Sequence, residues 1–181
     1  MEREQLAWMA GMFNGDGCIS LTLLDWRTRF NARVQVALSQ TDMEILGQCE
    51  EYVAKIIGKA PYRSVNKAHG DGKSDIHHIR MNKMVDVTTF LSAIRPWLVG
   101  KKAKKADLVM KYIERRKTFD HLNSNDVKRN IRNDEVSMRI VQEFYKLNNA
   151  KVPQKITDAL NDYLAREYGQ APGSAEYAHA A

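Results

Sequence analysis

The feature that most constrains this chain is a set of small residues spaced four apart in an apolar segment near its start. Ala7, Gly11 and Gly15 recur at this interval and therefore share one face of a helix. Glycine costs a helix about 0.5–1 kcal/mol relative to alanine, so two on one face favour a close approach by a second backbone. Asp16 follows, between Gly15 and Gly17, where we expect the helix to end. If the second backbone is another copy of this helix, two Asp16 carboxylates come together.

Two carboxylates at the end of a close helix pair favour a metal site. Like charges repel unless a divalent cation neutralises them, and Mg²⁺ prefers oxygen ligands. The alternative is a packed N-terminal helix that ends at a glycine and leaves Asp16 exposed without a task. Residue types alone leave both interpretations open, because short motifs also occur by chance.

The segment Met9–Gly17 resembles the motif of the LAGLIDADG homing endonucleases position by position. Met12 and Phe13 keep the apolar character of the motif, and Asn14 stands where the family has its first acid. The resemblance continues through the expected order of helices and strands to about Lys117. Four positions are identical to the motif: Ala10, Gly11, Asp16 and Gly17.

The resemblance implies a metal-dependent active site at the end of this helix. The family binds its catalytic metal through the second acid of the motif, which corresponds to Asp16, and the implied ligands are Asp16 and Gly15. A polar residue at the end of the second strand positions a metal-bound water in the family, and here it corresponds to Gln40. The expected cofactor is Mg²⁺. Mn²⁺ is expected to substitute for it, and Ca²⁺ to support binding without cleavage.

The family also carries an active-site lysine beside the scissile phosphate, a few residues after a proline. Counting back from Ala106 assigns this role to Lys102, whereas counting forward from Pro96 assigns it to Lys101. The two counts differ because this chain has one extra residue between the two anchors. We prefer Lys102 and keep Lys101 as the alternative.

Four stretches have the pattern of strands. Cys18–Trp26 and Asn31–Ser39 alternate apolar and polar residues with a period of two, which is typical of half-buried antiparallel strands. Pro61–Lys67 and Ser74–Met81 form a second pair around a loop that its glycines mark. Together they predict a curved four-stranded sheet with helices on one face and polar side chains on the other.

The polar face predicts a surface that binds DNA. Asn31, Arg33 and Gln35 can read base edges, and the basic turn at Arg27 and Arg29 can hold phosphate, although solvated side chains would give the same pattern. The residues expected to contact DNA are Ser20, Thr22, Leu24, Arg27, Arg29, Asn31, Arg33, Gln35, Arg63, Asn66, Lys67, Asp75 and His77.

The whole pattern predicts an α+β fold of order αββαββα with extra C-terminal helices. Thr41 and Glu44 have the spacing of a capping box that opens a helix, and Gly58 is placed to end it. We expect one domain over residues 1–168, with a core over 1–117 and a helical extension over 118–168. The small-residue tail 169–181 is expected to be disordered.

The sequence contains no second copy of the Met9–Gly17 pattern, so one chain cannot supply both acids. A C2 homodimer through the opening helix is therefore expected. Its predicted contacts are Ala7, Ala10, Gly11 and Asn14.

Composition agrees with a polyanionic partner. The 181 residues include 28 Lys and Arg against 22 acids, a net charge of +6. Other soluble proteins are equally basic, so the charge is supporting information only. Cys18 and Cys49 have no disulfide or metal-ligand spacing, which predicts a reduced intracellular compartment and two buried thiols. No apolar run reaches membrane-spanning length and Met1–Glu4 does not resemble a targeting peptide; a protein encoded in an organelle would need none.

The resemblance implies a site-specific endonuclease that acts on double-stranded DNA. It would make a double-strand break with short 3′ overhangs in a long pseudo-palindromic target at an intron insertion site. The alternatives are an RNA-binding maturase for intron splicing, with intron RNA as partner, and a DNA-binding regulator of the same fold that does not cleave. Asp16 favours cleavage, because a protein that only binds has no need for an acid beside the nucleic-acid backbone.

Overall fold

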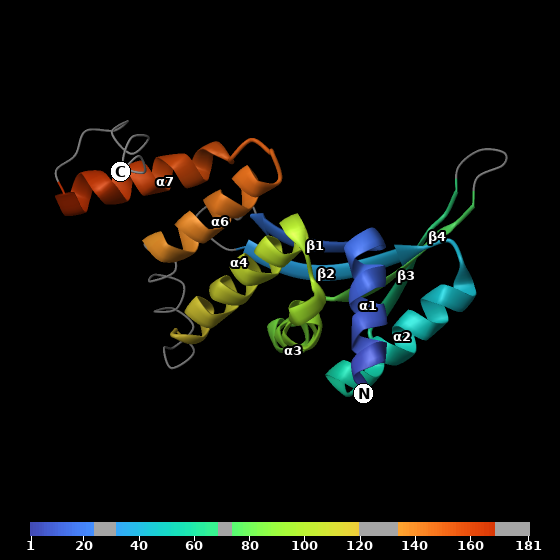
Figure 1. Cartoon of the computed structure of the whole chain (residues 1–181). Coiled ribbons are helices and arrows are strands. Elements are labelled where there is room, and N and C mark those ends of the chain that lie inside the picture. The colour runs from blue at the N-terminus through green and yellow to red at the C-terminus, as the bar shows by residue number, and fades with distance from the viewer. Residues whose placement is uncertain (24–31, 69–73, 120–133, 169–181) are drawn as a thin grey trace. The chain divides into compact units, whose positions relative to one another are not determined.

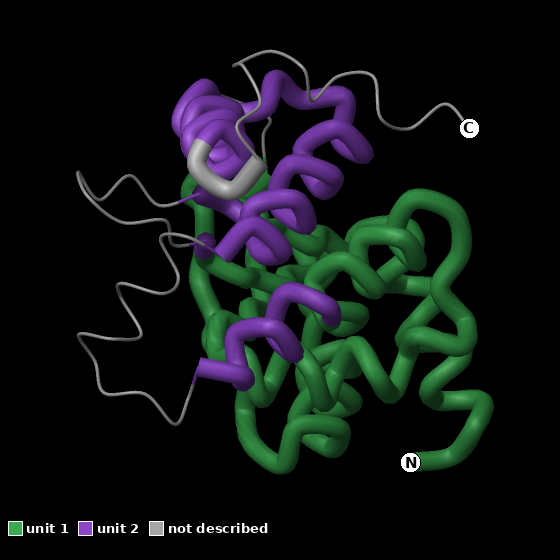
Figure 2. Tube along the Cα trace, turned by 90° about the vertical axis from the view of Figure 1, so that its left-hand side faces the viewer, with its two compact units in different colours: residues 1–21, 33–110 green, residues 22–32, 111–181 purple. Residues whose placement is uncertain are grey.

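The computed structural model describes residues 1–23, 32–68, 74–119 and 134–168 (Figure 1). The chain divides into two compact units, which Figure 2 distinguishes by colour. Unit 1 comprises Met1–Leu21 and Arg33–Met110, and unit 2 comprises Thr22–Ala32 and Lys111–Ala181. The expected division into a core over 1–117 and an extension over 118–168 stays a prediction. The compact units have other bounds, because the ends of two strands group with the C-terminal helices.

A four-stranded sheet forms the centre of unit 1. Its strands are β1 (Gly17–Leu23), β2 (Ala32–Gln40), β3 (Tyr62–Asn66) and β4 (Ile76–Met81), in the order β1-β2-β4-β3. β4 pairs antiparallel with both β2 and β3. β1 lies beside β2, and the connection over 24–31 is too short for a parallel crossover, so this pair is antiparallel as well.

Helices cover one face of this sheet. They are α1 (Arg3–Asp16), α2 (Met43–Ile57) and α3 (Met84–Ile94), which gather on the same side of the strands in Figure 1. A short 3₁₀ turn, η1 (Arg95–Trp97), follows α3 and leads to α4 (Gly100–Lys117). The chain ends with the extra helices α6 (Glu135–Leu147) and α7 (Gln154–Tyr168). The predicted α+β order αββαββα with additional C-terminal helices is confirmed.

The strands form because their apolar residues alternate, as the sequence indicated. Val34, Val36 and Leu38 of β2 are buried against the helices, whereas Arg33 and Gln35 lie on the opposite face with partial or full exposure. The alternation also explains a wrong prediction for one cysteine. Cys49 of α2 is buried as expected, but Cys18 is exposed, because its parity in β1 places it on the face opposite Ile19 and Leu21.

Aromatic contacts hold the helices of unit 1 together. The ring of Phe13 from α1 meets Phe90 from α3 edge to face, with 5.5 Å between centroids, and both rings are fully buried. Trp8 of α1 packs in the same geometry on Tyr52 of α2, at 5.4 Å. The start of α2 differs from the expected capping box, because Asp42 rather than Thr41 caps it and accepts hydrogen bonds from two backbone N–H groups of the first turn.

Unit 2 has a separate core formed by the second half of α4, by α6 and by α7. Tyr112, Met138, Val141 and Ile156 are fully buried in it. Asp134, with 4% of its surface exposed, joins α6 to α4: both of its carboxylate oxygens accept hydrogen bonds from Arg115 Nε, at 3.0 and 3.1 Å. No helix in the described part of the chain combines the length and the apolar character that crossing a membrane requires. The predicted tail, 169–181, lies outside the described residues.

Candidate active site and nucleic-acid interface

The candidate site is built where α1 ends and β1 begins. Asp16 is the last residue of the helix and is exposed, and Gly17 is the first residue of the strand. A Cβ atom at Gly17 would overlap the buried ring of Phe13, so only glycine lets the chain pass this close to the core. The glycine therefore makes it possible for the acid to stand directly at the helix end.

Gln40 reaches Asp16 from the last position of β2. Its Nε2 donates a hydrogen bond to Oδ2 of Asp16 at 2.5 Å. The contact joins two residues that are 24 apart in sequence, and it depends on the sheet bringing the end of β2 beside the end of α1. The amide therefore fixes one carboxylate oxygen and leaves the other oxygen of the exposed carboxylate without a contact to Gln40.

Lys102 of α4 lies against the same helix end. Its Nζ donates hydrogen bonds to the carbonyl oxygens of Phe13 at 2.7 Å, Asn14 at 2.6 Å and Gly15 at 2.9 Å. These carbonyls belong to the last turn of α1, where a helix leaves its acceptors unpaired and carries partial negative charge. An ammonium group has three N–H donors, so this arrangement uses all of them.

Burial lowers the pKa of Lys102 from its ordinary value, and the nearby charge of Lys105 acts in the same direction. The electrostatic interaction with Asp16 opposes this lowering of the Lys102 pKa. Lys101, the alternative from sequence, is exposed. Of the two lysines considered for the active site, Lys102 is thus the one that the structure brings to the end of α1.

Asn14 ties α1 to the segment before α4. Its Nδ2 donates to the carbonyl oxygen of Trp97 at 3.1 Å, and its Oδ1 accepts from the backbone N–H of Val99 at 3.3 Å. A carboxylate could accept the second bond but could not donate the first. This double contact gives a physical reason for an amide where the LAGLIDADG motif has an acid.

The face of α1 that carries the small residues is not covered by any other described part of the chain. Gly11 and Gly15 are exposed, and a Cβ atom added at either would meet no atom within 4 Å. Ala7 is partly exposed, as is Asn14. Ala10 differs: it is fully buried in the core of its own chain and offers no surface to a partner, because it lies on the side of the helix that packs inward.

The oxygen atoms at this helix end suit a hard divalent cation. The Asp16 carboxylate and the Gly15 carbonyl are both at exposed residues, and oxygen is the donor that Mg²⁺, Mn²⁺ and Ca²⁺ accept. Within the described ranges, however, no group of three or more His, Cys, Asp or Glu side chains is placed to hold a metal ion. One copy of the chain therefore fits such an ion only in part, with a single carboxylate.

The face of the sheet opposite the helices is polar. Residues that pair across strands share a face, so the register gives one row of Ser39, His78 and Ser64. A second row contains Ala37, Arg80 and Tyr62. We call this surface the open face.

Ser20 and Gln35, both expected to contact DNA, lie on this open face and form hydrogen bonds there. The backbone carbonyl oxygen of Gln35 accepts a bond from Ser20 Oγ at 3.3 Å, and Gln35 Nε2 donates to Asn82 Oδ1 at 2.9 Å. Arg33 has the same parity in β2 as Gln35 and is exposed, and Asn66 pairs with Ile76 beside the Ser64 row. Thr22, near the end of β1, is also exposed.

The structure corrects the placement of two residues predicted to bind DNA. Arg63 pairs with Ile79 in the register, on the face covered by helices, and forms an ion pair with Glu50 of α2. His77 has the same parity as Ile79 and is on that face too, whereas His78 is on the open face. The sequence contained the necessary signal. If Ile79 and Met81 are taken as the buried positions of β4, alternation places His77 on the buried face and His78 on the open face.

The remaining expected DNA contacts have other surroundings. Lys67 and Asp75 form an ion pair at 2.7 Å between the ends of β3 and β4, and the Asp75 carboxylate also accepts from the backbone of Ala68 at 2.9 Å. These bonds lower the pKa of Asp75, the one from Lys67 most. Four predicted contacts lie outside the described residues: Leu24, Arg27, Arg29 and Asn31.

Sequence reasoning missed the polar row at the centre of the open face. His78 Nδ1 lies 2.7 Å from Ser39 Oγ, within hydrogen-bond distance. Its Nε2 and the Oγ of Ser64 are buried atoms that have no hydrogen-bond partner among the described residues. Burial lowers the pKa of His78, and the charges of Arg80 and His77 lower it further.

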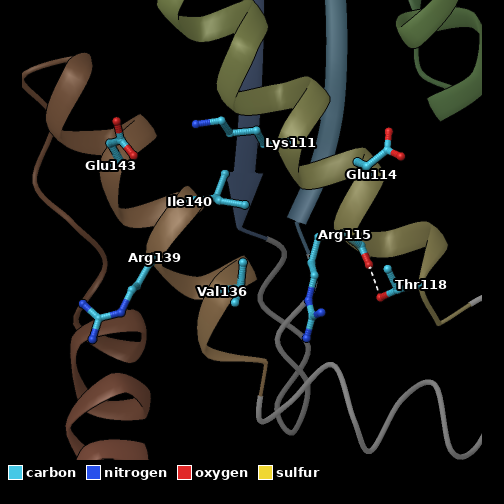
Figure 3. Close-up of a pocket in the computed structure, with 8 residues that line it drawn as sticks. All are labelled: Lys111, Glu114, Arg115, Thr118, Val136, Arg139, Ile140 and Glu143. Carbon is cyan, nitrogen blue, oxygen red and sulfur yellow. Dashed lines mark hydrogen bonds between the residues drawn. The ribbon is translucent and has the colours of Figure 1, made fainter.

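A separate hollow of about 560 Å³ lies between α4 and α6 in unit 2 (Figure 3). Its centre is formed by the aliphatic side chains of Val136 and Ile140, with charged side chains of both helices around them. No residue predicted from sequence to belong to the site lines it. The lining residues are Lys111, Glu114, Arg115, Thr118, Val136, Arg139, Ile140 and Glu143.

Solved structures show which fold this is. The chain is similar to the homing endonuclease I-CvuI, solved with its target in the presence of Ca, with a TM-score of 0.60 and 18% identity over 88% of this chain and 94% of that chain. It is similar to the homing endonuclease I-TnaI, with a TM-score of 0.51 and 18% identity over 87% of this chain and 97% of that one. It is also similar to part of the LAGLIDADG meganuclease I-AabMI, with a TM-score of 0.56 and 16% identity over 85% of this chain and 48% of that one.

No protein-family model matches the sequence, and no curated protein matches it. The structural matches nevertheless agree with each other, and the two homing endonucleases match over 88% and 87% of this chain. The chain has the fold of the LAGLIDADG homing endonucleases. The fold that the resemblance of Met9–Gly17 implied is thereby confirmed.

Proposed function

We propose that this protein is a site-specific, metal-dependent DNA endonuclease of the homing type that acts as a homodimer. The observation that carries the proposal is the cluster at the end of α1, where Gln40 holds an exposed Asp16 and Lys102 binds the preceding carbonyls. Structures of the same fold support it, since I-CvuI is solved with its target and I-AabMI bound to uncleaved DNA. The basic chain, with a net charge of +6, suits a polyanionic substrate.

The homodimer supplies what a single chain lacks. One chain offers Asp16 and the Gly15 carbonyl, and within the described ranges no group of three or more acids, cysteines or histidines is placed to hold a metal ion with them. A second copy related by a two-fold axis would contribute the same two groups. The open surface at Gly11 and Gly15 is where two α1 helices could approach closely.

Asp16 and Gly15 are the residues that would hold Mg²⁺, with Mn²⁺ as a substitute and Ca²⁺ supporting binding without cleavage. When bound, such an ion makes water more acidic and stabilises charge on the phosphate oxygens and the leaving oxygen. Gln40 would orient a water through its amide while it holds Asp16 in place. Lys102 fixes the end of α1 and adds positive charge beside it, and exposed Lys101 remains the alternative for a direct phosphate contact.

The open face would lie along the duplex. Arg33, Gln35 and Asn66 supply donors and acceptors for base edges, and Arg80 and His78 join them because the register places them on the same face. A two-fold dimer would read a long pseudo-palindromic target and cut both strands, leaving short 3′ overhangs.

The test is selection of cleaved duplexes from a random library, with Mg²⁺ or with Ca²⁺. We expect recovery of one family of sites cut with Mg²⁺, and binding without cutting with Ca²⁺. Asp16→Asn should still bind the selected site in Ca²⁺ but lose cleavage. Glu44→Gln is the matched control, because it removes one exposed negative charge at the start of α2, and it should cut like the unmodified protein.

Two outcomes would contradict the proposal. Undiminished cleavage by Asp16→Asn would show that the acid is not part of the site. Binding of duplex DNA, or of intron RNA, without cleavage in Mg²⁺ or Mn²⁺ would favour the regulator or the maturase instead.

A further inference from the structure

Two tyrosines of unit 2 hold the backbone at the ends of β1 and β2. Tyr112 Oη, from α4, accepts a hydrogen bond from Ala32 N at 3.2 Å and donates one to Ala32 O at 3.3 Å. Tyr145 Oη, from α6, accepts a hydrogen bond from Leu23 N at 3.3 Å. Ala32 is the first residue of β2 and Leu23 the last of β1, so the two phenols hold the strand ends on either side of residues 24–31.

The polar backbone groups at a strand end need hydrogen-bond partners, and here tyrosine hydroxyls supply them. Tyr112 is fully buried, and burial raises the pKa of its phenol, so it remains a neutral O–H that can donate and accept together. By bonding both polar groups of one residue, it fixes the direction in which β2 begins.

The position of Tyr145 is itself fixed by the attachment of α6. Ser137 Oγ donates to Asp134 Oδ2 at 2.5 Å, and Arg115 of α4 binds the same carboxylate. Phe144, next to Tyr145, is buried in the core of unit 2. The hydroxyl that binds Leu23 is therefore carried by a helix that is anchored independently of β1.

We propose that Tyr112 and Tyr145 are positioning residues through which the C-terminal helices set the DNA affinity and base preference of the ends of β1 and β2. Thr22 and Arg33 are the immediate neighbours of the held residues and are exposed. Their side chains leave the backbone in directions that Leu23 and Ala32 determine. The inference rests on the proposed DNA-binding function and gives the extra helices a task in it, one that does not involve the chemistry at Asp16.

The test uses Tyr145→Phe in the full-length chain. Tyr52→Phe is the matched control, because it removes a phenol hydroxyl whose exposed hydrogen bond goes to Gln48 on the same helix, α2. The first measurement is amide hydrogen exchange without DNA, in which Leu23 N–H should lose protection in Tyr145→Phe and keep it in the control. This readout needs no DNA and no metal, so it tests the contact even if the proposed function fails.

The second measurement is the dissociation constant for the selected duplex in Ca²⁺. Loss of one hydrogen bond should weaken binding about fivefold in Tyr145→Phe, which is about 1 kcal/mol. Penalties for base changes should shrink in one part of each half-site, while the cleavage rate at saturating DNA stays within about twofold. Tyr52→Phe should change none of these quantities.

An unchanged dissociation constant and unchanged base preference in Tyr145→Phe, with Leu23 N–H deprotected, would overturn the inference and leave the tyrosine a purely structural role. Full protection of Leu23 N–H in the variant would overturn it as well. Failure of the unmodified protein to bind any duplex would instead refute the proposed function.

Discussion

Gly11→Ala should stabilise the single chain and weaken the dimer. Gly11 lies inside α1, and an added Cβ would meet no atom of the described residues within 4 Å. The methyl group therefore costs nothing within the monomer, and the higher helix propensity of alanine should contribute about 0.5–1 kcal/mol to its folding. Gly11→Ala can stabilise the monomer and weaken association at the same time only if another molecule binds at the open surface.

In the proposed dimer, the same methyl group lies where two helix backbones approach. Overfilling a packed contact costs about 1–3 kcal/mol, and a two-fold axis introduces the methyl from both chains. Since 1.4 kcal/mol is a factor of ten, the dimer dissociation constant should rise by about 5-fold to 150-fold. A mere change of helix propensity would leave that constant unaltered.

Gly47→Ala is the matched control. Gly47 lies inside α2, and a Cβ added there also meets no atom within 4 Å. Urea unfolding at a concentration where each protein is monomeric should show a similar gain for both variants. Sedimentation equilibrium over a range of concentrations should then show weaker association for Gly11→Ala alone.

The reasoning is refuted if both variants gain stability and associate as strongly as the unmodified protein, because Gly11 then lies outside the interface. An unmodified protein that stays monomeric at micromolar concentration in the presence of its DNA would refute the homodimer altogether.

Three further predictions concern single side chains. Lys102→Met should lower the free energy of unfolding by about 1–3 kcal/mol in urea titrations, because it removes three hydrogen bonds from a charged donor, whereas exposed Lys101→Met should change it little. Thiol titration at pH 8 should modify Cys18 rapidly and Cys49 only after unfolding, because burial, with a smaller effect of Asp16, raises the pKa of Cys49 to about 11. Folding lowers the pKa of His78 and so favours its neutral form. The stability that neutral His78 contributes is therefore complete above about pH 6.5 and is lost as the pH falls through the lowered pKa. Between pH 7 and pH 5, the urea midpoint should fall less in His78→Gln than in the unmodified protein.

The strands and helices could be predicted because each follows from a local pattern. The alternation from Ala32 to Leu38 assigns β2 and both of its faces, and Gly58, with a φ of 75°, ends α2 as glycine at that position allows. Errors occurred where the pattern was weak. In β4, two adjacent histidines give no hydrophobic contrast, and the choice between His77 and His78 depended on the burial of Ile79, which shares a face of the strand with His77.

The candidate site was predictable in its residues but not in its contacts. Spacing alone left Lys101 and Lys102 open, and only the packing of α4 against α1 brings one ammonium group to three carbonyls. The tyrosine contacts had no sequence signal at all. Tyr112 and Ala32 are 80 residues apart and Tyr145 and Leu23 are 122 apart, and a hydroxyl that binds backbone requires no particular residue type opposite it.

The end of α1 links metal binding, dimerisation and folding of the site in the proposed function. Each chain brings one Asp16, so association without a cation places two negative charges near each other, and this repulsion opposes the dimer. A cation that binds only between two chains must then strengthen association by the same factor by which association strengthens cation binding. Ca²⁺ should therefore lower the dimer dissociation constant of the unmodified protein in sedimentation equilibrium. Asp16→Asn removes the repulsion as well as the two carboxylate ligands, so its dimer should be tighter without a cation and should not respond to Ca²⁺. An equal response in both proteins would show that the cation binds elsewhere.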